Sequence, residues 1–299
     1  MTGNQAMRTQ AGPIEARPRF DSWEAAVRWI REQPGQCELI RDAFYDDPLL
    51  AAAERYHRGT EWQDIRLLLR GRHGTALDVG AGRGIASYAL AREGFAVTSL
   101  EPDPSDLVGA GAIRALARES GLLIGVVEDF SERLPFDDST FDVVFARAVM
   151  HHTRDLNSAC AEFQRVLKPG GLFLGVREHV ISRHEDLPAF LAAHPMHDLY
   201  GGENAFLLDE YLTALRNARL TVERVLEPLG SPINYFPQTE DSLRDQIAAH
   251  AGRIPGLRTI VGALLRPRPF FNAAIGVLTR FDSRPGRLYS FVCTKPEAR

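Results

Sequence analysis

Three glycines lie within five residues, directly after an apolar segment that contains one acid. The segment 77–84 reads Leu-Asp-Val-Gly-Ala-Gly-Arg-Gly, so Gly80, Gly82 and Gly84 follow Asp78 in one tight turn. Glycine adopts backbone angles that are closed to other residues and lets a ligand approach the main chain. A helix is predicted directly after the loop, and its free N–H groups would face the ligand. The pattern indicates a site for a nucleotide-type cofactor.

Two residues of this segment argue against a dinucleotide. The G-x-G-x-x-G fingerprint would need glycine where this chain has Ile85. The carboxylate of Asp78 would repel a diphosphate, but it would favour a ligand that carries an ammonium group. The loop therefore suits a nucleoside joined to an amino acid. An NAD-linked oxidoreductase is disfavoured, also because no Tyr-x-x-x-Lys pair occurs in the right region.

A second carboxylate closes the next predicted strand. Glu101 lies nineteen residues after Gly82, where an acid can accept hydrogen bonds from ribose hydroxyls, and Pro102 adjoins it. Dinucleotide folds share this spacing. The spacing therefore supports a ligand that contains a nucleoside, but it does not identify that ligand.

The loop resembles the first motif of class I S-adenosylmethionine-dependent methyltransferases, in which an apolar strand, an acid and an apolar residue precede G-x-G-x-G. Residues 127–142 resemble the stretch around the third and fourth strands in the small-molecule branch of that family, the "methyltransferase type 11"-like proteins. The segment 167–171, Leu-Lys-Pro-Gly-Gly, matches too, so the resemblance covers about 76–176. It implies S-adenosylmethionine as cofactor and methyl transfer to a small-molecule acceptor.

The resemblance also implies cofactor-binding residues. In that family an acid just after the third strand meets the adenine amino group. Asp129 is the nearest match, with Glu128 or Ser131 as alternatives because the spacing to Leu134-Pro135-Phe136 has one residue more than usual. Phe130 is expected to stack on the adenine. The full expected set is Asp78, Gly80, Ala81, Gly82, Gly84, Glu101, Pro102, Asp129, Phe130 and Arg147, with Tyr56 as a pocket aromatic whose alternative is a place in the core.

Three histidines are the candidate catalytic residues. His151 and His152 follow the C-terminal end of the fourth predicted strand, and His179 leaves the fifth at the same edge, where ligands bind in parallel sheets. A neutral imidazole there can accept a proton from a hydroxyl acceptor. The alternatives are imidazoles held by the backbone and, for His179, a surface charge cluster with Arg177 and Glu178.

The sequence does not predict a metal site. His194 and His197 are three residues apart and would share a helix face, so that with Asp198 or Glu203 they could ligate an ion. Pro195 interrupts such a helix, and no third ligand is fixed by the spacing.

The elements that must position these residues alternate between strand and helix. Strands are predicted at 76–79, 96–100, 122–127, 143–146 and 172–176, and helices at 85–93, 106–119 and 156–166. This alternation produces a parallel sheet with right-handed crossovers. The predicted fold class is therefore α/β, a Rossmann-like doubly wound sheet of about seven strands, mostly parallel with the last strand antiparallel.

The remaining segments extend this core. The predicted organisation is a disordered tail (1–18), a helical segment (19–70), the cofactor-binding core (71–178), a lid insertion (179–206), a core helix and strand (207–227), a helical lid or interface insertion (228–286), and a final strand and tail (287–299). The stretch 254–281 could form an amphipathic face for membrane contact, but its prolines favour a lid or homodimer surface.

The composition of the chain limits which partners and which cellular location are expected. The formal net charge is −4 and the basic residues are scattered, which argues against nucleic acid. No run reaches the length of a membrane span. Cys37, Cys160 and Cys293 fit neither a disulfide framework nor a zinc cluster, so a cytoplasmic location is expected. A second hypothesis keeps this fold without catalysis, as a binding protein or partner subunit.

Overall fold

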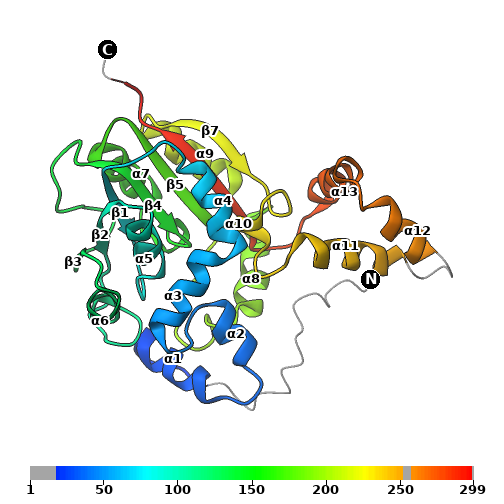
Figure 1. Ribbon diagram of the computed structural model, residues 1–299, viewed down its shortest axis with the longest axis horizontal. Helices are drawn as coiled ribbons and strands as arrows, with labels where there is room; N and C mark the ends of the chain where they lie inside the picture. The colour runs from blue at the N-terminus through cyan, green and yellow to red at the C-terminus, as the bar shows by residue number, and fades with distance from the viewer. Residues whose placement is uncertain (1–17, 252–256, 298–299) are drawn as a thin grey trace.

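One mixed β-sheet runs through the molecule and carries helices on both faces (Figure 1). The computed structural model describes residues 18–251 and 257–297, so nearly all of the predicted tail lies outside the described residues. The strand order is β3-β2-β1-β4-β5-β8-β7, with β6 paired to β5. The strands are β1 Thr75–Val79, β2 Ala96–Leu100, β3 Ile124–Val127, β4 Phe141–Arg147, β5 Leu167–Ile181, β6 Phe206–Leu207, β7 Thr221–Leu226 and β8 Arg287–Thr294.

Only β8 runs against its neighbours in the described sheet, because it pairs antiparallel with both β5 and β7. The other pairings are parallel. This confirms the predicted α/β class, including the antiparallel last strand.

Both faces of the sheet are buried. Ala76 and Leu77 are neighbours in β1 but belong to different hydrophobic clusters, because successive side chains of a strand point to opposite faces. The first cluster includes residues of α3 (Leu49–Arg58), α4 (Thr60–Leu68) and α5 (Ile85–Arg92). The second includes residues of α7 (Leu156–Val166) and α9 (Leu208–Asn217).

The longest strand departs most from the prediction. The sequence favours a strand over 172–176, but β5 spans fifteen residues and reaches Ile181. Arg177 has a φ of 61°, and the register against β8 shifts between Gly175 and Glu178. The strand is thus locally irregular at the point where its hydrophobic pattern stops, yet pairing continues. His179 therefore lies within the strand and not in a loop after it.

The N-terminal helices join the first insertion to the core. The two outer helices are α1 (Trp23–Glu32) and α2 (Cys37–Asp42). Buried residues of α1 pack with Met196 and Leu199, and the Phe20 N–H donates to the Leu199 carbonyl at 2.7 Å. Helix α6 (Ala110–Ser120) covers the β3 side of the sheet. It starts four residues later than predicted, after a turn in which the Ala110 N–H bonds the Asp103 carbonyl.

The two insertions differ in placement. The first holds the 3₁₀ turn η2 (His184–Asp186) and α8 (Leu187–Ala193), and it ends at β6. In the second, the short α10 (Pro232–Tyr235) lies beside α4, whereas α11 (Glu240–Ala251), α12 (Leu257–Leu264) and α13 (Arg268–Phe281) form an arm that extends away from the sheet (Figure 1). Whether this insertion serves as the predicted lid or as an interface stays a prediction.

The arm has its own small apolar cluster. Phe271 and Ile275 of α13 pack with Leu243 of α11, while Phe270 and Phe281 are exposed. None of the helices among the described residues has the length and apolar character needed to cross a membrane.

Candidate functional site

The C-terminal ends of β1 and β4 meet where the strand order changes direction. From β1 the order runs to β2 and β3 on one side, and β4 and β5 lie on the other. Ligands bind at such a switch point in open parallel sheets. A Cβ atom placed on Gly80 would lie 2.7 Å from Val149 Cγ2, so the loop after β1 touches the loop after β4. The latter leads into the 3₁₀ turn η1 (Met150–His152).

The glycine loop adopts a backbone that only glycine favours. Gly80, Gly82 and Gly84 have φ values of 59°, 54° and 80°, and Gly84 caps the N-terminus of α5. A Cβ atom on Gly82 would come within 4 Å of only one described atom outside its immediate neighbours, the Val108 carbonyl oxygen at 3.9 Å. The main chain at Gly82 is therefore open to close approach by a ligand.

Glu101 ties the end of β2 to this loop. Its Oε2 accepts a hydrogen bond from the Gly82 N–H at 2.7 Å, and its Oε1 accepts one from the Asp103 N–H at 2.9 Å. Burial raises the pKa of its carboxyl. The Ala81 N–H donates to the Leu100 carbonyl at 3.1 Å, and Pro102 is exposed beside it. The predicted cofactor residues of β1 and β2 thus lie together.

Asp78 lies beneath the loop and not at an open surface. Its side chain is 1% exposed and accepts a hydrogen bond from the Ser87 hydroxyl at 2.5 Å, and that hydroxyl is 2.7 Å from the Ser99 hydroxyl. Burial raises the pKa of Asp78 to about 7. Asp78 is buried because this strand position points its side chain at α5, and its contact with a cofactor stays a prediction.

Replacing Asp78 with asparagine is expected to change how stability depends on pH. The folded-state pKa of Asp78 is raised, so its favourable contribution is present near pH 4 and is lost as pH rises through about 7. The asparagine amide does not titrate, so the unfolding free energy of D78N relative to the wild type should increase by about 3–4 kcal/mol between pH 4 and pH 8. Urea unfolding of both cofactor-free proteins across this range measures the difference, and parallel pH profiles would contradict it.

Asp129 and Phe130 follow the end of β3. The Asp129 Oδ1 accepts a hydrogen bond from the Phe130 N–H at 2.8 Å, and the Phe130 ring is 55% exposed. The alternatives to Asp129 are engaged elsewhere: Glu128 pairs with Arg114 at 2.6 Å, and the Ser131 hydroxyl contacts Glu132 at 3.4 Å. This geometry favours Asp129 among the three, and its role in binding adenine stays a prediction.

Tyr56 and Arg147 belong to a buried polar network that the sequence did not reveal. Glu61 in α4 is 1% exposed and accepts hydrogen bonds from Arg147 Nε at 2.6 Å and from the Tyr56 hydroxyl at 3.2 Å. Arg177 Nη1 lies 3.6 Å from the same carboxylate. Tyr56 is 1% exposed and packs in the core, which is the alternative that the sequence left open. Its ring does not line an open pocket.

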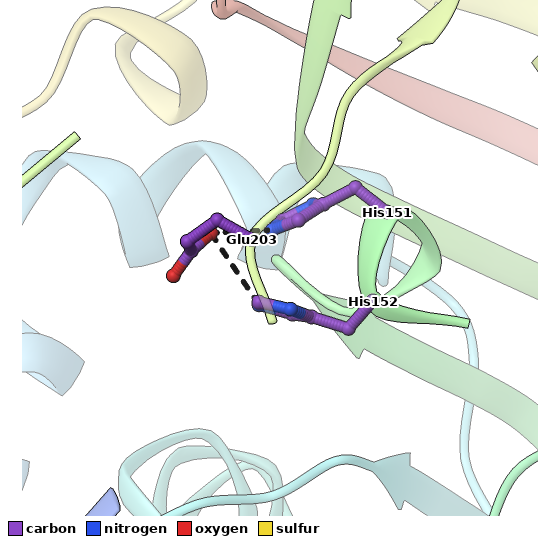
Figure 2. Close-up of side chains that lie close together, drawn as sticks. All are labelled: His151, His152 and Glu203. Atoms are coloured by element: carbon purple, nitrogen blue, oxygen red, sulfur yellow. Dashed lines mark ion pairs between the residues drawn. The ribbon is translucent and has the colours of Figure 1, made fainter. Parts of the chain in front are cut away.

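His151 and His152, in the turn after β4, lie beside Glu203 (Figure 2), and His151 also pairs with Glu178 of β5. His151 is 1% exposed, and its Nδ1 lies 2.7 Å from Glu178 Oε2. His152 Nδ1 lies 2.9 Å from the Gly202 carbonyl oxygen. The His179 ring is 4.7 Å from that of His151. The three predicted catalytic residues therefore form one group.

Burial sets the protonation of this group. It lowers the pKa of His151 and of His179 well below the ordinary value, and that of His194 to about 4. It also raises the pKa of Glu178 to about 7. The buried imidazoles are therefore neutral at neutral pH, which is the form that accepts a proton.

Comparison with known proteins identifies the core. Residues 77–175 match the model of a family described as a methyltransferase domain. The chain carries a methyltransferase domain. The matched residues run from β1 into β5 and include the glycine loop, Glu101, Asp129 and the histidine pair. The predicted family is confirmed.

Curated relatives extend the match beyond this domain. The chain is 28% identical over 202 residues to a ubiquinone biosynthesis O-methyltransferase of Paramagnetospirillum magneticum, covering 66% of this chain and 80% of that protein. It is 35% identical over 130 residues to a demethylmenaquinone methyltransferase of Chlorobaculum tepidum, covering 43% of this chain and about half (51%) of that protein.

Solved structures share the fold at low identity. The geranyl diphosphate C-methyltransferase of Streptomyces coelicolor aligns with a TM-score of 0.55 at 17% identity, covering 85% of this chain and 87% of that one. The [4+2]-cyclase SpnF aligns with a TM-score of 0.52 at 20% identity, covering 79% and 81%. Because the fold is also found in a cyclase, the fold alone does not fix the reaction.

Proposed function

We propose that this chain transfers a methyl group from S-adenosylmethionine to a small-molecule acceptor at the switch point between β1 and β4. The arrangement of Gly82 and Glu101 supports this most strongly. A carboxylate stands 2.7 Å from the N–H of a glycine whose Cα face is open, at the N-terminal side of α5. Main-chain N–H groups and a carboxylate at this edge suit a nucleoside joined to an amino acid.

Different residues of the chain would bind different parts of the cofactor. The loop from Gly80 to Gly84 would hold the amino-acid part against the main chain, Glu101 would accept hydrogen bonds from the ribose hydroxyls, and Asp129 with Phe130 would hold the adenine. The sulfonium supplies an activated methyl group when the cofactor is bound. The protein's task is then to align the acceptor with that methyl group and to exclude water.

The histidine group supplies the proposed base. An acceptor hydroxyl must lose its proton as its oxygen takes the methyl group, and a neutral imidazole within hydrogen-bonding reach can accept that proton. His152 is the most accessible candidate, since its side chain is 41% exposed whereas that of His151 is 1% exposed. His179 is the second candidate. The relative named as a ubiquinone biosynthesis O-methyltransferase favours an oxygen acceptor on a small molecule.

Calorimetric titration tests the cofactor assignment. We expect S-adenosylmethionine and its demethylated product to bind the purified chain with dissociation constants of about 1–1000 µM, the usual range for enzyme substrates. NAD should not bind. Binding of NAD alone would overturn the assignment. Turnover with labelled S-adenosylmethionine and a panel of phenols, quinols and prenyl compounds then separates an enzyme from a non-catalytic binding protein.

The homodimer and the cytoplasmic location remain proposals. The exposed Phe270 and Phe281 on the arm formed by α11–α13 are available for a contact between copies of the chain. Light scattering of the purified chain measures its oligomeric state directly.

A further inference from the structure

We propose that His151, His152 and Glu203 bind a divalent transition-metal ion of the zinc class, beside the proposed acceptor position. The sequence predicts no metal site, and the pairing that its spacing suggests is that of His194 with His197. The structure brings together a different set, from two segments about fifty residues apart in the chain (Figure 2). These are the turn η1 and the loop between α8 and β6.

The distances fit a metal site with little rearrangement. Glu203 Oε2 lies 3.8 Å from Nε2 of His151 and 3.8 Å from Nε2 of His152. The ligand atoms of the three residues all lie within 4.8 Å of one another. Ligands that bind zinc tetrahedrally at its usual bond lengths are about 3.4 Å apart. Each imidazole therefore needs to approach the carboxylate by about 0.4 Å, and the two imidazole nitrogens need to approach each other by at most about 1.4 Å.

The hydrogen bonds of the rings direct the free nitrogens inward. His152 Nδ1 lies 2.9 Å from a carbonyl oxygen, that of Gly202, and a carbonyl cannot donate, so Nδ1 carries the proton. His151 Nδ1 faces Glu178, whose carboxylate also accepts the N–H groups of Val149 and His151. In both neutral rings the lone pair is then on Nε2, which faces Glu203. Metal-binding histidines characteristically donate their other N–H to a carboxylate or a carbonyl in this way.

A second trio shares the same carboxylate. Glu203 Oε1 lies 3.6 Å from His194 Nδ1, and the ligand atoms of His179, His194 and Glu203 also lie within 4.8 Å of one another. His179 Nδ1 lies 2.9 Å from the Gly286 carbonyl oxygen, which leaves the lone pair of its neutral ring on Nε2. His194 Nδ1 is buried without a hydrogen-bond partner. An orphaned ring nitrogen that faces a buried carboxylate is what an intervening cation would satisfy.

The donor set selects the kind of ion. Imidazole nitrogens with one carboxylate suit zinc, iron, nickel or copper, whereas magnesium and calcium take oxygen ligands. The Glu203 side chain is 4% exposed, and the two imidazoles beside it supply no fixed positive charge to neutralise its carboxylate. Three protein ligands leave coordination positions for water or for an oxygen of the acceptor. With the ion bound, Nε2 of His152 is a ligand and cannot accept the acceptor's proton, so the proposed base is then His179, whose Nδ1 faces the Gly286 carbonyl. Metal binding does not depend on methyl transfer, so it can be tested without knowing the acceptor.

Cobalt binding to the untagged full-length chain tests the proposal. After dialysis against a chelator, titration with Co²⁺ should give visible absorption bands at one equivalent, and added Zn²⁺ should displace them. H152A and E203Q should each weaken Co²⁺ binding by about tenfold or more, as the loss of a ligand does. The matched control is H184A, because His184 is 65% exposed at its side chain and lies near Glu210 outside both trios.

Each outcome decides the proposal. Circular dichroism confirms the fold of each variant, and H152A carries the test if E203Q unfolds, because the His152 side chain is 41% exposed. No cobalt bands in the wild type, or equal affinity of wild type and H152A, would overturn the site. Titration of the metal-free protein with S-adenosylmethionine distinguishes the two proposals. Retained cofactor binding without cobalt binding removes the metal site and leaves the methyltransferase assignment standing.

Discussion

Replacing Gly82 with alanine should weaken S-adenosylmethionine binding by about a hundredfold or more while the fold is kept, a loss of about 2.7 kcal/mol. The added methyl group would project into space where the only described atom within 4 Å, outside the neighbouring residues, is the Val108 carbonyl oxygen. In the cofactor-free protein it therefore meets no obstacle. In the complex it would stand between the main chain and the ligand, which the Gly82 backbone is otherwise free to approach.

A control variant separates the backbone strain of G82A from its effect on cofactor affinity. Gly82 has a φ of 54°, and alanine in that region costs about 1–2 kcal/mol. Gly121 is the matched control, because its φ is 69° and a Cβ atom there would meet nothing within 4 Å. G121A should show the same loss of stability with unchanged cofactor affinity. Calorimetry and urea unfolding of both variants make the comparison, and wild-type affinity in G82A would refute the proposed cofactor position.

Gly80, in the same loop, lacks the open space that surrounds Gly82. A Cβ atom there would lie 2.7 Å from Val149 Cγ2, closer than van der Waals contact allows. G80A should therefore disturb the loop after β4 together with the loop after β1. We therefore expect that packing between the two loops requires glycine at position 80, and that ligand binding requires glycine at position 82.

Local patterns predicted the sheet well because each strand and helix is specified by neighbouring residues. The helix over 156–166 and the strand over 96–100 have the predicted bounds. The apolar alternation of β5 ends near Val176, and the prediction ended with it. Pairing with β8 continues the strand to Val180, and pairing with β6 includes Ile181. Pairing depends on two segments that are distant in the sequence, so a local window of residues does not contain it.

The sequence predicted which residues lie at the shared edge of the sheet, but it did not predict how they pair. Glu101 is nineteen residues from Gly82 and follows a spacing that a strand–helix–strand unit imposes. Glu178 and His151 are separated by 27 residues, and Glu61 and Arg147 by 86. Their pairing depends on the order of strands and on where the N-terminal helices pack. Nothing in the residue types around Glu61 distinguishes it from other helix-surface glutamates.

Two partly buried arginines, Arg147 and Arg177, face the buried carboxylate of Glu61. Arg147 donates to Glu61 through Nε at 2.6 Å and Nη2 at 3.0 Å, and Arg177 Nη1 lies 3.6 Å away. Although burial acts to raise it, these arginines hold the pKa of Glu61 below its ordinary value. Burial lowers the pKa of Arg177 to about 10 even with this carboxylate beside it. These contacts join α4 to the end of β4 and to β5.

E61Q should therefore lower the free energy of unfolding by about 3–5 kcal/mol, because it leaves buried positive charge without a partner. Urea unfolding measures the loss. E54Q is the control, since Glu54 pairs with Arg58 on the surface and such pairs contribute about 0–1 kcal/mol. Adding R147M to E61Q should recover part of the loss, because it removes one uncompensated charge. Equal destabilisation by E61Q and E54Q would mean that the network is solvated in solution and does not hold the N-terminal helices to the sheet.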